Sequence, residues 1–182
     1  MRSGTAPGPR LVALAALWIV AAAATAQQPP AFAPNIVEIT PRLVTSGQPS
    51  AKGLSTLGAQ GFEAVVYHAP PTVSDAVRDE ALIVGRQGLV FVDIPIEFDH
   101  PTERDYELFA GVLDALGKRK VLVHCQINMR ASSLVFLYRV VARHEDPHRA
   151  YESVAAVWSP EGPWKRLIVE LLRKHDVKFD PY

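Results

Sequence analysis

The chain has 182 residues, and its 19 basic and 19 acidic side chains give a formal net charge of zero. This balance excludes a strongly basic protein, and nothing in it indicates nucleic acid or an anionic membrane as a partner. The length suits one domain with a substantial core. Because Cys125 is the only cysteine, no internal disulfide can form, and the thiol is either reactive or buried.

The first 26 residues are predicted to be a secretory signal peptide. Arg2 and Arg10 precede an apolar stretch at 11–24, and Ala24-Thr25-Ala26 fits an A-x-A cleavage site. An uncleaved membrane anchor is the alternative. We therefore expect an exported protein, periplasmic or extracellular, with no stable membrane association after cleavage.

Beyond a flexible lead-in expected at 27–36, strand and helix patterns alternate through a single predicted domain at 37–182. In chain order we first expect an edge strand or hairpin at 37–44, a short helix capped by Ser50 and ending near Gly61, and a buried strand at 62–67. A helix from Ser74 to Gly85, a strand at 89–94, and a helix capped by Thr102 and ending at Gly117 are expected next. The last elements expected are a strand at 121–124 and helices at 131–143, 147–158 and 163–175. This alternation predicts an α/β fold with a central, mainly parallel sheet flanked by helices.

Cys125 directly follows a predicted strand and precedes a short loop and a helix. Free backbone N–H groups at the start of a helix form an anion site, and a thiol there is favoured in its thiolate form. A nucleophile in an anion-binding loop predicts attack on a phosphoester. The alternative is a buried structural cysteine.

Arg130 ends the same loop, and its planar guanidinium matches two phosphate oxygens in a way that lysine cannot. The backbone N–H groups of Gln126, Ile127, Asn128 and Met129 are candidates to hold the remaining charge. Asn128 tolerates a positive φ better than most residues, and Gln126 is a candidate to position water. A solvated arginine at a helix start is the alternative role for Arg130.

Other polar residues near this loop have predicted supporting roles. The His124 side chain is expected to point away from the pocket and to hydrogen-bond backbone near the loop, although a core histidine without a catalytic part fits equally well. A leaving group needs a proton, and in the acidic loop we prefer Asp99 to Glu97 as its donor. Ser132 or Ser133 is a candidate donor to the departing thiolate, or else a helix-face serine.

The motif His124-Cys125, followed by Arg130 and a serine and preceded by an acidic loop, resembles the cysteine-dependent protein tyrosine and dual-specificity phosphatases. Segment 42–50 (RLVTSGQPS) resembles the opening strand and turn of bacterial members, and the resemblance extends to about residue 172. It implies that Cys125 is the nucleophile, Arg130 the phosphate clamp and Asp99 the general acid. It implies no metal or other cofactor, and a phosphorylated small molecule or protein as the substrate.

This chain departs from the family pattern in its loop. The family usually places five residues between its cysteine and arginine, whereas four stand here. Asn128 occupies the place of the usual glycine, and Ala131 stands where a hydroxyl residue is expected. Two other readings are therefore open: a rhodanese-like sulfurtransferase, whose loop is similarly short, and a relative that binds phosphate or phosphoprotein without turnover.

Overall fold

The computed structural model describes Met1, Gly4 and residues 32–182. Apart from Met1 and Gly4, the predicted signal peptide at 1–26 lies outside the described residues, as does the lead-in as far as residue 31. None of the helices in the described part has the length and apolar character needed to cross a membrane.

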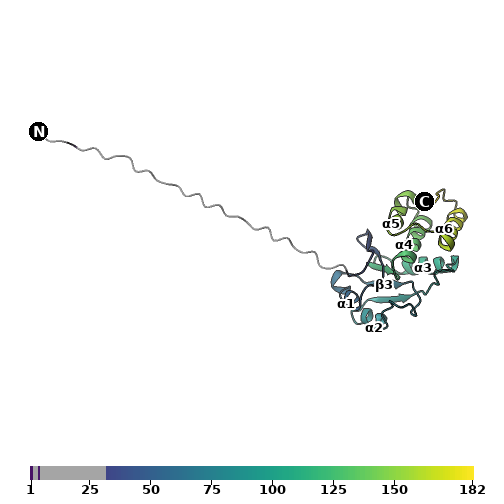
Figure 1. Cartoon of the computed structure of the whole chain (residues 1–182), viewed down its shortest axis with the longest axis horizontal. Coiled ribbons are helices and arrows are strands. Elements are labelled where there is room, and N and C mark those ends of the chain that lie inside the picture. Colours follow the sequence, from purple (N-terminus) through teal and green to yellow (C-terminus); the bar gives the residue numbers. More distant parts are fainter. Residues whose placement is uncertain (2–3, 5–31) are drawn as a thin grey trace.

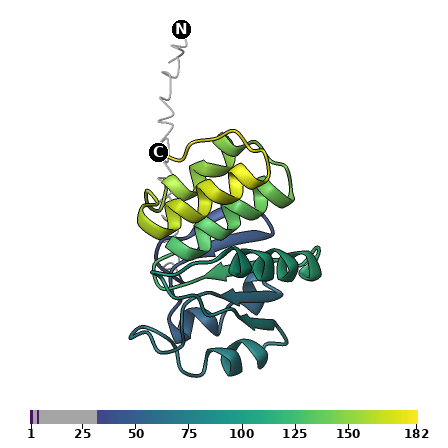
Figure 2. The same cartoon turned by 90° about the vertical axis from the view of Figure 1, so that its right-hand side faces the viewer.

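A five-stranded sheet forms the centre of the fold (Figures 1 and 2). Its strands are β1 (Val37–Thr40), β2 (Leu43–Ser46), β3 (Ala64–Tyr67), β4 (Val90–Asp93) and β5 (Val121–His124). In space they follow the order β1-β2-β5-β3-β4. β1 and β2 form an antiparallel hairpin, whereas the other neighbours run parallel. The mainly parallel sheet predicted from the sequence is confirmed.

Helices cover both faces of this sheet. They are α1 (Ala51–Leu54), the short 3-10 turn η1 (Gly58–Gln60), α2 (Glu80–Gly85), α3 (Glu103–Leu116), α4 (Met129–Leu137), its π-helical continuation η2 (Tyr138–Ala142), α5 (Pro147–Ala155) and α6 (Gly162–Lys174). α1 and α2 lie on one side, and α3 to α6 lie on the other (Figures 1 and 2). The predicted caps Ser50 and Thr102 each accept a hydrogen bond from the first turn of their helix.

The helix predicted from Ser74 is shorter than expected, because α2 begins only at Glu80. Residues 74–79 form a loop instead, and Asp75 in that loop bonds to Gln126 beside the cysteine. Within α2, Leu82 is exposed and Val84 is buried. A tertiary contact therefore prevails over the local helical pattern.

The sheet separates two apolar clusters because side chains alternate along its strands. On β5, Val121 and Val123 pack into the larger cluster with α3, α4, α5 and α6, whereas Leu122 packs into the smaller one with α1 and α2. β5 is thus buried on both faces and has a parallel neighbour on each side. Its carboxyl end is a rigid platform for the residue that follows, Cys125.

Residues 32–36, which fall within the predicted lead-in at 27–36, contact the domain. The carbonyl of Pro34 accepts from the Gly47 N–H at 2.8 Å, and the carbonyl of Asn35 accepts from Asn128 at 2.7 Å. Phe32 meets the ring of Phe62 edge-on, with the ring centroids 6.0 Å apart. This segment is therefore attached to the domain directly beside the loop that follows β5.

Candidate active site

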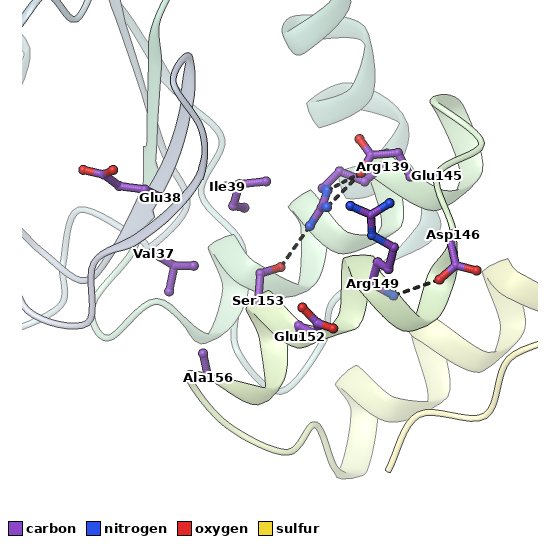
Figure 3. Close-up of a pocket in the computed structure, with 10 residues that line it drawn as sticks. All are labelled: Val37, Glu38, Ile39, Arg139, Glu145, Asp146, Arg149, Glu152, Ser153 and Ala156. Carbon is purple, nitrogen blue, oxygen red and sulfur yellow. Dashed lines mark hydrogen bonds and ion pairs between the residues drawn. The ribbon is translucent and has the colours of Figure 1, made fainter.

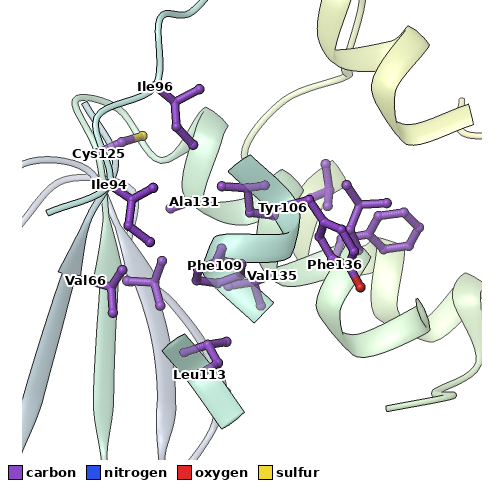
Figure 4. Packing of buried hydrophobic residues seen from close by; sticks show 14 of the residues in the cluster. Val66, Ile94, Ile96, Tyr106, Phe109, Leu113, Cys125, Ala131, Val135 and Phe136 are labelled. Atoms are coloured by element: carbon purple, nitrogen blue, oxygen red, sulfur yellow. The ribbon is translucent and has the colours of Figure 1, made fainter. Parts of the chain in front are cut away.

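Cys125 lies at the carboxyl end of the central strand and is fully buried. Ile94, Ile96 and Ala131 surround it in the larger apolar cluster (Figure 4). Its N–H donates to the Ser46 carbonyl at 3.3 Å, and within the described residues its sulfur makes no hydrogen bond. The sulfur thus lies at the carboxyl ends of the parallel strands, which is where such sheets bind their ligands.

The loop from Cys125 to the start of α4 turns through Asn128, which has φ 73° as its residue type allowed. Nδ2 of Asn128 donates to the Asn35 carbonyl at 2.7 Å and to Oγ1 of Thr45 at 3.0 Å. The same amide that suits the turn therefore also fastens it to β2 and to segment 32–36.

The peptide groups of this loop are oriented by the neighbouring chain. The Gln126 carbonyl accepts from the Gln48 N–H at 2.9 Å, so the Ile127 N–H in the same trans peptide points the opposite way. In the described part of the chain, the N–H groups of Gln126, Ile127, Met129 and Arg130 donate to no protein acceptor. A cluster of free donors at a helix start is a site for an anion.

Arg130 is the cation of this loop, and it is only 5% exposed. Its Nε donates to the Ile96 carbonyl at 2.9 Å, its Nη1 to Oε1 of Gln126 at 3.4 Å, and its guanidinium lies 5.0 Å from the centre of the Phe98 ring. No carboxylate of the described residues pairs with it. A buried guanidinium without a counter-ion is costly, so its environment is arranged for an anion that arrives from solution.

His124 contacts a carboxylate instead of the backbone that was predicted. Its Nε2 lies 2.6 Å from Oε1 of Glu80, and both side chains are buried. The other oxygen of Glu80 accepts from Nε2 of Gln48 at 2.9 Å. The imidazole ring of His124 stacks on the Tyr67 ring, with the ring centroids 4.8 Å apart. His124 therefore joins the strand before the cysteine to α2 and to the turn after β2.

His68 lies one strand away, at the end of β3, and is also fully buried. Burial lowers the pKa of His68 to about 3, and the charges of His124 and Arg130 act in the same direction. The nearby Ile94 carbonyl only partly opposes this effect. His68 is therefore neutral at ordinary pH and adds no second cation beneath the loop.

The two acidic candidates occupy the loop between β4 and α3, and both are exposed. They flank Phe98, whose ring lies over Arg130 and whose carbonyl accepts from Nε1 of Trp164 at 2.9 Å. Asp99 also lines a small cavity beside α6. No hydrogen bond joins Glu97 or Asp99 to Cys125 or Arg130 within the described residues.

The two serines after Arg130 lie inside the first turns of α4. The hydroxyls of Ser132 and Ser133 donate to the Met129 carbonyl, at 3.2 and 2.9 Å. Gln126 differs, because its Nε2 donates to Oδ1 of Asp75 at 2.9 Å while its Oε1 faces Arg130. The structure therefore places Gln126 at the loop's rim and the serines within the helix.

Sequence reasoning missed four polar residues around this loop: Gln48, His68, Asp75 and Glu80. Gln48 lies in a turn that the family resemblance includes, so a signal for it existed. The other three reach the loop only through the arrangement of β3, α2 and β5, which no local pattern encodes.

A separate cavity of about 550 Å³ between β1 and α5 shares no lining residue with the loop (Figure 3).

Replacing Glu80 by alanine is expected to lower the free energy of unfolding by about 3 kcal/mol, since it leaves buried polar groups of His124 and Gln48 without a partner. Urea unfolding followed by circular dichroism measures the change. The matched control is Glu103→Ala, which removes an exposed ion pair with Lys174 and should change stability little. Equal stability of the Glu80→Ala variant and the native protein would contradict this role.

The fold and the loop together define the class, a cysteine-dependent phosphatase domain. The model of a family described as a DSP-PTPase phosphatase fused to NAD+ kinase matches residues 33–165. That range is most of the chain, and the protein belongs to this family of dual-specificity and tyrosine phosphatase-like domains.

Solved structures agree with this assignment. A DUF442 protein from Shewanella putrefaciens CN-32 is 28% identical with a TM-score of 0.72, and the match covers 79% of this chain and 92% of that one. Tk-PTP, solved in its active form, is 20% identical with a TM-score of 0.62 and coverages of 79% and 97%. TpbA of P. aeruginosa, solved with phosphotyrosine, is 19% identical with a TM-score of 0.55 and coverages of 80% and 98%. The last two show the fold alone. No curated protein sequence matches this chain.

Proposed function

We propose that the protein hydrolyses phosphomonoesters through a phosphocysteine on Cys125, with Arg130 as the phosphate clamp. One observation carries this proposal: a buried arginine without a carboxylate partner lies beside free backbone N–H groups in the loop that begins at the cysteine. The loop is one residue shorter than the usual pattern, yet it still presents these donors. A dianionic phosphate would satisfy both the guanidinium and the N–H groups.

The reaction proceeds in two displacements at phosphorus. The Cys125 thiolate attacks, the bond from phosphorus to the ester oxygen breaks, and that oxygen leaves with a proton from a nearby acid. Water then attacks the phosphocysteine, inorganic phosphate departs, and the thiolate is restored. Arg130 and the loop N–H groups stabilise the charge on the equatorial oxygens in both steps. We place Gln126 at the loop's rim as the residue that orients this water.

We propose Asp99 as the acid for the first step, because it lies nearer the apex of the acidic loop than Glu97 and matches the general acid that the family resemblance implies. Asp99→Asn is expected to slow phenyl phosphate hydrolysis about 100-fold, whereas Glu97→Gln slows it only a few-fold. Steady-state kinetics on esters with good and poor leaving groups measures the difference. The reverse order would assign the acid to Glu97.

Hydrolysis of 4-nitrophenyl phosphate without added metal tests the proposal as a whole. We expect turnover that vanadate inhibits and a chelator does not. Formation of thiocyanate from thiosulfate and cyanide, with no phosphate release, would instead identify a sulfurtransferase. Tight binding of phosphotyrosine without turnover would identify a binding protein that has lost catalysis.

We also propose that the protein is exported to the periplasm or beyond. The apolar stretch at 11–24 and the Ala24-Thr25-Ala26 site support this proposal. Amino-terminal sequencing of the protein made in a bacterial host should give a mature chain that begins at Gln27. An intact amino terminus in the membrane fraction would indicate an uncleaved anchor.

A further inference from the structure

A groove of about 570 Å³ lies directly beside the loop that follows Cys125. Gln126 and Ile127 belong to both the loop and the groove wall. The opposite wall comes from segment 32–34, from Pro49 after β2, and from the loop before α2. The groove therefore adjoins the loop of the proposed phosphate site, although Cys125 and Arg130 are not among its lining residues.

Apolar side chains make up most of this wall. They are Phe32, Ala33, Pro34, Pro49, Val77 and Ile127. Ile127 is 48% exposed, whereas Cys125, Asn128 and Arg130 in the same loop are buried. Phe32 is held by its contact with Phe62, so this wall exists before a ligand arrives. Such a surface suits a flat or aliphatic organic group.

Asp75 is the one charged side chain among the residues that line the groove. It is exposed, and it accepts one hydrogen bond, from Gln126, which leaves most of its acceptor capacity free. No lysine or arginine is among the lining residues. The groove therefore attracts a cation or an N–H donor and repels a second phosphate.

The groove lies within reach of a phosphate held by the clamp. Through the Gln126 side chain, the Asp75 carboxylate is no more than about 9 Å from the Arg130 guanidinium. One phosphate group with a hydrogen bond on each side spans about 8 Å. A peptide whose phosphate is bound at Arg130 can therefore bring a neighbouring side chain to Asp75.

We infer that Asp75 makes this groove a specificity subsite, and that the subsite favours a basic residue next to the phosphorylated residue of a peptide substrate. The inference rests on the proposed function. Asp75 pairs with the lysine or arginine, and the aliphatic stem of that side chain packs on the apolar wall. A polyphosphorylated small molecule is disfavoured, because its second phosphate would face Asp75 without any cation in the groove.

Two phosphotyrosyl peptides that differ only in a lysine or a glutamate beside the phosphotyrosine test this inference. For the native protein, kcat/KM should be about tenfold higher with the lysine peptide, and Asp75→Lys should reverse the preference. Asp79→Lys is the matched control, since Asp79 is exposed in the same loop and is not among the groove-lining residues. This control should keep the native preference.

The possible failures are distinguishable. If both peptides are hydrolysed in a Cys125-dependent way but Asp75→Lys leaves their ratio unchanged, the groove inference is overturned and the proposed function stands. An equal shift in the Asp79→Lys variant would also overturn it, because the effect would then come from net charge. If the native protein hydrolyses neither peptide nor any aryl phosphate, the proposed function itself is overturned.

Discussion

Cys125→Ser is expected to lower the rate of aryl phosphate hydrolysis at least about 10⁴-fold while the variant remains folded and still binds phosphotyrosine. A serine hydroxyl stays protonated at neutral pH and is a far weaker nucleophile than a thiolate. The two side chains are nearly the same size, so the buried position among Ile94, Ile96 and Ala131 can accept serine. Steady-state kinetics and calorimetric titration with phosphotyrosine measure the two effects.

The rate of hydrolysis and the affinity for phosphotyrosine must be interpreted together. Retained binding with lost turnover assigns a chemical role to the sulfur and leaves the anion site intact. A variant that hydrolyses the ester at a tenth of the native rate would show that Cys125 is a structural core residue. Thermal unfolding of the variant serves as the control for folding.

Arg130→Lys is the second large effect, and we expect kcat/KM to fall about 1,000-fold, or about 4 kcal/mol of transition-state stabilisation. Lysine keeps the charge but cannot bind two phosphate oxygens in one plane. It also lacks the Nε that donates to the Ile96 carbonyl, so its ammonium group would not be held over the loop. Kinetics on 4-nitrophenyl phosphate measures this loss.

Arg139→Lys is the matched control, since Arg139 is largely buried and pairs with Glu145 in the separate cavity beside α5 (Figure 3). That variant should keep its activity within about twofold while losing some stability. An Arg130→Lys protein with kcat/KM within threefold of native would contradict the role of the guanidinium as a clamp.

The sequence was sufficient for features that depend on neighbours along the chain. The apolar run at 121–124, ended by His124 and Cys125, predicted β5 and the loop after it. The residue type of Asn128 indicated a position that tolerates positive φ, and Thr102 indicated the start of α3. Each of these rests on a local preference of the backbone or on a cap, and such preferences are visible within a few residues.

Features that depend on contacts across the fold were not predictable in this way. A glutamate in a helix pattern is typical of an exposed helix face, yet α2 places Glu80 in a buried contact with His124 at the end of β5. Asp75 was assigned to a helix, yet it bonds to Gln126 in a loop. Segment 32–36 has a composition typical of a linker, and only its bonds to Gly47 and Asn128 show that it belongs to the domain.

These contacts explain how a small domain holds a reactive site steady. β5 carries the cysteine, and its burial on both faces fixes the starting point of the loop. Asn128 ties the middle of the loop to β2, and Arg130 is oriented by the Ile96 carbonyl and the Phe98 ring. The free N–H groups are thus preorganised, which is what electrostatic stabilisation of a transition state requires.

The most direct test of this account is to trap the covalent intermediate. The native protein is mixed with an aryl phosphate, quenched in acid within milliseconds, digested and analysed by mass spectrometry. We predict phosphate on the sulfur of Cys125, and none in the Cys125→Ser protein. Rapid hydrolysis with no phosphate on any peptide, or with phosphate on a different side chain, would contradict the account.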